Sequence, residues 1–156
     1  MPDATAHTGP AGVRIVLGLD FGLRRIGLAA GDTLTRTAGP HPAIACGPAG
    51  PDWAALGRVI ATLRPSLLLV GRPVHMDGTP TAMTAAAAQF ATDLAARTGL
   101  PVQQVDERGS SIEAQARLRE RRASGLMRRR VQRDDIDSAA AVIILERWFA
   151  GEAHPS

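Results

Sequence analysis

The chain has 156 residues, of which 45% are hydrophobic and 21% charged, with a formal net charge of +3. One cysteine, Cys46, excludes a disulfide framework, and the absence of lysine (all 18 basic residues are arginine) excludes a P-loop nucleotide clamp and a Schiff-base enzyme. No apolar run reaches the roughly 18–20 residues of a membrane span and residues 1–12 lack a secretory signal, so we expect a cytoplasmic protein without a membrane partner.

The order of apolar segments predicts one α/β domain over residues 13–150. Residues 13–20 form a nearly continuous apolar run, which is typical of a strand buried on both faces. The elements expected after it are strands at 26–30 and 35–45, a loop at 47–51, a helix from 52 to 63 capped by Asp52, a strand at 67–70, a helix at 81–97, a strand at 102–105, a helix starting at Ser110 or Ser111, and a last helix at 135–150. This order predicts a mixed sheet with an antiparallel start, between a disordered tail at 1–12 and a short tail at 151–156.

Acidic residues follow two of these strands and open the last helix. Asp20 ends the first strand, where open α/β sheets bind their ligands. Asp106 and Glu107 close a later strand, and because neighbouring side chains on a strand point in opposite directions, only one should face the site. Asp137 lies near the start of the last helix, three residues after Asp134. Taken singly, each residue also fits a turn or a helix start.

Together, carboxylates from three parts of the chain predict a metal site. Clustered carboxylates repel one another unless a cation neutralises them, and Mg²⁺ or Mn²⁺ prefers oxygen ligands. Two such ions activate water and stabilise the leaving oxygen of a phosphodiester. The pattern therefore favours hydrolysis of nucleic acid.

An arginine-rich segment supports a nucleic-acid partner. Residues 117–133 contain eight arginines and one acid, for a net charge of +7, while the rest of the chain carries −4. Such a basic stretch on an acidic body is typical of a polyanion-binding protein, although a solvated helical face is the alternative. Because the chain has only two Trp and three Phe, phosphate contacts suit it better than base stacking.

Four motifs resemble those of the YqgF/RuvX family, in the same order and over residues 15–149. They read LDFGLRRIGLA at 19–29, VGRPVHMDGT at 70–79, DER at 106–108 and DSAAAVIIL at 137–145. The resemblance implies an RNase H-like fold related to the resolvase RuvC, with a five-stranded mixed sheet. It implies a divalent-metal nuclease that matures the 5′ end of precursor 16S ribosomal RNA or resolves branched DNA. We expect nucleic acid as the partner, association with the ribosome, and a monomer or a homodimer.

The matching positions assign roles to individual residues. The resemblance gives Asp20, Glu107 and Asp137 the catalytic and metal-binding roles, with Mg²⁺ or Mn²⁺ as cofactor. We expect the substrate phosphates to be bound by arginines at five positions, namely Arg108, Arg128, Arg129, Arg130 and Arg133.

The sequence departs from the family pattern at three places. Gly109 stands where a bulky apolar residue is usual and is expected to loosen the start of the next helix, His75 replaces a common asparagine, and Asp134-Asp135 is added before the last motif. Either Asp106 or Asp134 is therefore an alternative ligand. The remaining alternative functions are a DNA-junction resolvase, a non-catalytic nucleic-acid-binding module, and, less favoured, a nucleotide-binding kinase.

Overall fold

The computed structural model of the chain describes residues 14–125 and 133–151. The predicted tails at 1–12 and 151–156 lie outside these ranges, except for Gly151. In the described part, no helix is long and apolar enough to span a lipid bilayer.

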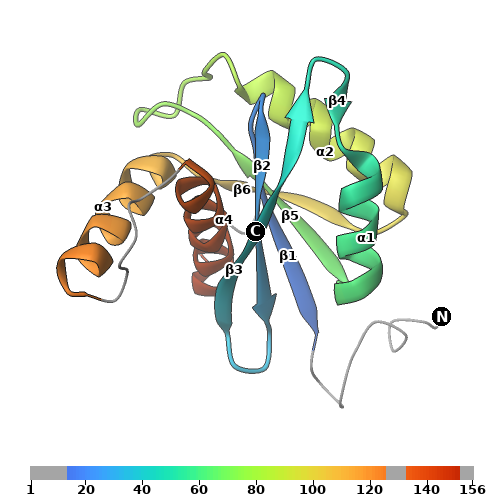
Figure 1. The fold of residues 1–156 in the computed structure, drawn as a ribbon. Coiled ribbons are helices and arrows are strands. Elements are labelled where there is room, and N and C mark those ends of the chain that lie inside the picture. The colour runs from blue at the N-terminus through green and yellow to red at the C-terminus, as the bar shows by residue number, and fades with distance from the viewer. Residues whose placement is uncertain (1–13, 126–132, 152–156) are drawn as a thin grey trace.

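A mixed sheet organises the structure around its central strand, β1 (Ile15–Phe21). β1 pairs antiparallel with β2 (Arg25–Asp32), which pairs antiparallel with β3 (Thr37–Gly47). On its other side β1 runs parallel to β5 (Leu67–Arg72), and β5 runs parallel to β6 (Val102–Asp106). The predicted mixed sheet with an antiparallel start is therefore confirmed, and the parallel strands β1, β5 and β6 end at the same edge (Figure 1).

Several boundaries differ from the sequence prediction by a few residues, and two of the differences have a clear local cause. The predicted loop at 47–51 contains a two-residue strand, β4 (Gly50–Pro51), so the described sheet has six strands rather than five. The helix expected from residue 81 is α2 (Thr84–Thr98), because residues 81–83 form a turn in which the Thr84 hydroxyl accepts a hydrogen bond from the Thr81 N–H at 2.8 Å. Neither a two-residue strand nor a side-chain turn leaves a periodic hydrophobic signal.

Helices cover both faces of the sheet (Figure 1). α1 (Trp53–Leu63) and α2 pack against one face, where Leu56, Phe90 and Leu94 join the core formed with Leu17 and Leu19. The predicted cap is confirmed, since the Asp52 carboxylate accepts a hydrogen bond from the Ala55 N–H at 3.0 Å. The opposite face is covered by α4 (Arg133–Ala150), with α3 (Ser110–Ala123) packed against α4.

Glycines let α4 approach the sheet unusually closely. A Cβ atom placed on Gly27 of β2 would lie 2.1 Å from the carbonyl oxygen of Asp137, and one on Gly18 of β1 would lie 2.9 Å from Leu145. No real Cβ atom tolerates the first distance, so only glycine at position 27 allows this packing. The close approach positions the start of α4, including Asp137, beside the edge where the sheet carries its acidic residues.

We predict that Gly27→Ala destabilises the protein because α4 must move away from β2 to admit the methyl group. Urea unfolding should show a loss of about 1–3 kcal/mol, the usual cost of overpacking a core. Gly39→Ala on β3 is the matched control, since a Cβ there meets no atom within 4 Å. Equal effects of the two substitutions would contradict the packing described here.

Candidate active site

A cavity of about 710 Å³ opens at the edge where the parallel strands end. Asp20, near the end of β1, Glu107, directly after β6, and Asp137, near the start of α4, all line it. The three carboxylates predicted from the sequence therefore share one cavity. Their roles as ligands and catalytic groups remain a prediction.

Asp20 and Glu107 are in direct contact. A hydrogen bond joins their carboxyl groups, and the Glu107 residue is only 6% exposed. Burial raises the pKa of Asp20 to about 6, helped by the negative charge of Asp137. Burial, the Asp20 charge and the shared hydrogen bond together raise the pKa of Glu107 to about 10. At neutral pH the pair therefore holds a proton, which is how two adjacent buried carboxyls avoid repulsion.

The surroundings of Glu107 fit its carboxyl group closely. A Cβ atom on Gly71 of β5 would lie 2.4 Å from Glu107 Cδ, so glycine at this position provides the space that the carboxyl group fills. The Ser110 hydroxyl, at the start of α3, donates a hydrogen bond to Glu107 Oε2 at 3.3 Å. Gly109 adopts a left-handed φ of 70°, which favours glycine. Although glycine replaces the bulky apolar residue usual at this position, Glu107 remains in contact with Asp20.

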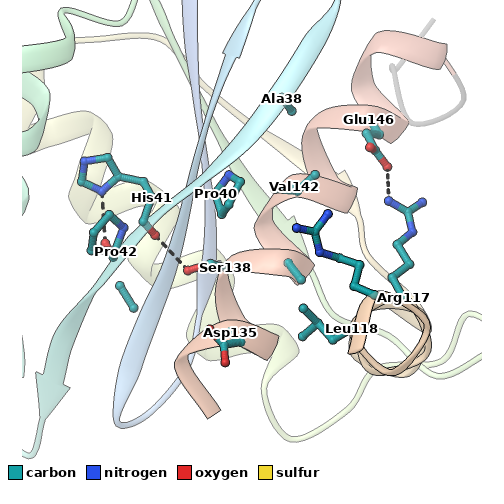
Figure 2. A pocket seen from close by; sticks show the side chains of 13 residues that line it. Ala38, Pro40, His41, Pro42, Arg117, Leu118, Asp135, Ser138, Val142 and Glu146 are labelled. Atoms are coloured by element: carbon teal, nitrogen blue, oxygen red, sulfur yellow. Dashed lines mark hydrogen bonds and ion pairs between the residues drawn. The ribbon is translucent and has the colours of Figure 1, made fainter. Parts of the chain in front are cut away.

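Asp137 is held by an arginine of the same cavity. Its Oδ2 accepts a hydrogen bond from Arg25 Nε at 2.8 Å, in an ion pair whose side chains are 30% and 23% exposed for Arg25 and Asp137. The next residue, Ser138, donates a hydrogen bond to the carbonyl of His41 on β3 at 2.8 Å (Figure 2). Together with Gly27, these contacts fix where Asp137 lies.

A second cavity, of about 780 Å³, lies between β3 and the pair of helices α3 and α4. Figure 2 shows the side chains that line it. Its lining includes Pro40, Pro42, Leu118 and Val142, and the Arg117 guanidinium beside it donates to Glu146 at 2.6 Å. None of the three predicted ligands lines this cavity. This cavity is therefore separate from the carboxylates that the sequence predicts as ligands.

The alternation predicted for Asp106 and Glu107 agrees with the structure. Asp106 does not line the acidic cavity; the Arg108 guanidinium binds its carboxylate, with Nη2 2.7 Å from Oδ2. Hydrogen bonds from Arg108 hold the pKa of Asp106 below its usual value. Arg108 also donates from Nη1 to the carbonyl oxygen of Met76 at 3.1 Å. In this structure its guanidinium joins two parts of the protein, and substrate binding by Arg108 stays a prediction.

The arginine-rich segment is only partly visible. The four arginines of α3 are all exposed, namely Arg117, Arg119, Arg121 and Arg122. Arg117 is paired with Glu113 and Glu146. Of the predicted phosphate-binding residues, Arg133 begins α4, while Arg128, Arg129 and Arg130 lie outside the described residues. The side chain of Asp134, the other alternative ligand, is likewise not described.

Sequence reasoning missed two arginines of the acidic cavity. Arg24 lies in the turn between β1 and β2, Arg25 begins β2, and both line the cavity. The sequence could have indicated them, because they follow Asp20 by four and five residues and a tight turn brings the chain back beside the end of the strand. The partner of Arg25 is 112 residues away in the sequence and could not be inferred from that spacing.

The fold and the acidic strand edge define the class of protein. The chain matches the solved structure titled "T. thermophilus RuvC in complex with Holliday junction substrate", with a TM-score of 0.52, 20% identity, and coverage of 89% of this chain and 95% of that one. At this level of identity the likeness shows the fold alone, an RNase H-like fold of the RuvC type.

Sequence comparison identifies the family. The family model RuvX, described as Holliday junction resolvase, matches residues 14–151. A protein of Burkholderia vietnamiensis named "Putative pre-16S rRNA nuclease" is 44% identical over 85% of this chain and 87% of its own length. A protein of the same name from Xanthomonas campestris pv. campestris is 43% identical over 96% and 94%. The chain belongs to the RuvX family, which confirms the resemblance seen in its motifs.

The raised pKa of Glu107 predicts how stability depends on pH. Between about pH 4.5 and pH 10 the folded protein holds a proton on Glu107 that the unfolded chain releases, so the free energy of unfolding falls as pH rises. The loss is at most about 1.4 kcal/mol per pH unit for one proton. Urea titrations of metal-free protein at pH 6 and pH 8.5 measure it.

Glu107→Gln should flatten this pH dependence because the buried side chain no longer titrates. Glu120→Gln, an exposed position on α3, is the matched control and should leave the slope unchanged. If metal-free wild-type protein gained stability toward pH 8.5, the contact between Asp20 and Glu107 would be wrongly described.

Proposed function

We propose that this chain is a divalent-metal-dependent endonuclease that processes the 5′ end of precursor 16S rRNA. Membership of the RuvX family makes it a nuclease, a hydrolase that acts on phosphodiester bonds. The observation that carries the finer proposal is the cavity in which Asp20, Glu107 and Asp137 meet at one edge of an RNase H-like sheet.

The donor set suits a hard divalent cation. Asp20 and Glu107 offer adjacent carboxylate oxygens, the ligands that Mg²⁺ and Mn²⁺ prefer, and their raised pKa values reflect burial and close negative charge that a cation would relieve. As placed, no three acidic, histidine or cysteine side chains of the described ranges form a ready metal cluster. Asp137 is paired with Arg25. Asp20 and Glu107 would hold the ion, and Asp137 would join them on exchanging its arginine partner.

Other residues of the chain would position the carboxylates and bind the substrate. A bound Mg²⁺ or Mn²⁺ would supply activation of water and stabilisation of the leaving oxygen. Gly71 and Ser110 keep the Glu107 carboxyl group directed at Asp20, while Arg25 orients Asp137. Arg24 is exposed at the cavity and would bind a phosphate beside the scissile one, and the arginines of segment 117–133 would bind phosphates further away.

The names of the relatives favour the RNA substrate. Proteins of 40–44% identity to this chain carry the pre-16S rRNA nuclease name, whereas the RuvC likeness, at 20% identity, concerns the fold. The rRNA assignment would bring the protein to ribosomal precursors in the cytoplasm, as a monomer or a homodimer. Cleavage of four-way DNA junctions is the second candidate, because the family model is described as Holliday junction resolvase.

We predict that Asp20→Asn abolishes Mg²⁺-dependent cleavage of a precursor 16S rRNA fragment and leaves RNA binding intact. Even an indirect partner of a metal ligand is worth roughly 10–100-fold in activity, so loss of a ligand should cost more than 100-fold. Gel assays of cleavage and fluorescence anisotropy of binding measure the two effects. Asp93→Asn, an exposed position on α2, is the control and should cleave like wild type. Full cleavage by Asp20→Asn would refute the proposed site.

One preparation should be assayed on both substrates in parallel. We expect a higher kcat/KM for the rRNA fragment than for a synthetic four-way DNA junction. A clear preference for the junction would transfer the proposal to the second candidate. Absence of Mn²⁺ binding in calorimetry, with RNA binding retained, would instead indicate a non-catalytic binding module.

A further inference from the structure

Exposed apolar side chains gather around the acidic cavity. Among the described residues, four large apolar side chains are exposed to 64–70%, namely Leu23, Leu34, Met76 and Ile112. Leu23 and Ile112 line the acidic cavity. The Met76 sulfur lies 3.3 Å from the position of a Cβ on Gly109, which also lines that cavity. We call Leu23, Met76 and Ile112 the apolar rim.

The apolar rim is built on ordered structure. Leu23 belongs to the tight turn between β1 and β2, and Ile112 to the first turn of α3. Met76 lies in a loop closed by the hydrogen bond from the His75 N–H to the Thr79 carbonyl at 2.8 Å, and Arg108 binds its own carbonyl at 3.1 Å. Three separate segments thus each expose one apolar side chain to solvent beside the acidic cavity. Single exposed apolar residues are common, but a gathered set indicates a binding surface.

The chemistry of the cavity identifies what the rim contacts. A phosphodiester that reaches Asp20 and Glu107 brings its neighbouring nucleotides against the cavity wall. Arg24, in the cavity wall, can bind a phosphate. The side chains of the apolar rim have no hydrogen-bond donor, and their one acceptor is the weak thioether sulfur of Met76. They gain contact only from apolar surface, and the faces of nucleobases are the large apolar surfaces of a nucleic acid. In a duplex, stacking covers those faces.

We propose that the apolar rim binds the faces of unpaired nucleobases beside the scissile phosphate, so that the site selects nucleotides outside a regular duplex. This inference rests on the proposed nuclease function and deepens it. The rim residues act as apolar wedges, a role that Leu, Ile and Met fill in proteins that unstack bases. The same chemistry applies to RNA and DNA.

The test compares one labelled strand in two settings, annealed to its full complement or to a strand that leaves a central bubble of unpaired nucleotides. The wild type should cleave within the bubble with a kcat/KM roughly tenfold or more above that for the duplex. The triple variant Leu23→Ser, Met76→Ser, Ile112→Ser should lose this preference by roughly tenfold, which corresponds to about 1.4 kcal/mol. Leu34→Ser is the matched control, since Leu34 is equally exposed but lies beyond the far end of β2, about 24 Å along the strand from the cavity.

A second readout does not depend on cleavage. In the Asp20→Asn background, 2-aminopurine placed in the bubble should change its fluorescence on binding, and the three serine substitutions should remove most of that change. Thermal unfolding of each variant confirms that the exposed substitutions leave the fold intact.

The outcomes separate the two proposals. If the wild type cleaves neither substrate, the proposed function fails, and the fluorescence result alone decides on the rim. If the wild type cleaves duplex and bubble equally, or if the triple variant keeps the wild-type preference, the rim proposal is overturned and a protein partner is the occupant to examine. Equal effects of Leu34→Ser and the triple variant would overturn it as well.

Discussion

The contact between the carboxyl groups of Asp20 and Glu107 is the constraint on which the site depends. Two carboxyls that are buried side by side remain stable only by sharing a proton or by binding a cation. The parallel pairing of β1, β5 and β6 brings the two residues together, although they are 87 positions apart in the sequence. Glycine at position 71 leaves the space in which the contact forms.

The same constraint explains why Asp137, the third acidic residue of the cavity, is paired with an arginine. A third free carboxylate beside a buried pair would add repulsion. In this structure the negative charge of Asp137 is instead neutralised by an ion pair with Arg25. Close packing of α4 on Gly27 brings Asp137 to the cavity, and Ser138 fixes the helix on β3. In this structure Arg25 therefore neutralises Asp137, while the buried pair of Asp20 and Glu107 holds a proton. The apolar rim adds a surface that favours bases over phosphates.

Much of this architecture follows from local sequence patterns. Continuous apolar runs located the buried strands, and Asp52 marked the start of α1 because a capping side chain acts within its own turn. Strand alternation separated Glu107 from Asp106. These features depend on neighbours within a few residues, which a sequence displays directly.

The remaining features depend on contacts between distant segments. The sequence predicts that Arg108 binds substrate phosphates, and that role stays a prediction. Its contacts with Asp106 and the Met76 carbonyl could not be inferred from the sequence. The pairing of Arg25 with Asp137 and the two-residue strand β4 exist only because the folded chain brings their partners near. Positive charge in a sequence indicates affinity for anions, and the fold decides whether the anion is internal.

Proton release on metal binding tests the central claim most directly. Calorimetric titration of Mn²⁺ into wild-type protein at pH 7.5, in buffers of different ionisation enthalpy, counts the protons displaced. Because the buried pair shares a proton at this pH, the account predicts that binding releases about one proton per site, and that Glu107→Gln removes the release. Tight binding of Mn²⁺ by the wild type without proton release would contradict the shared-proton site.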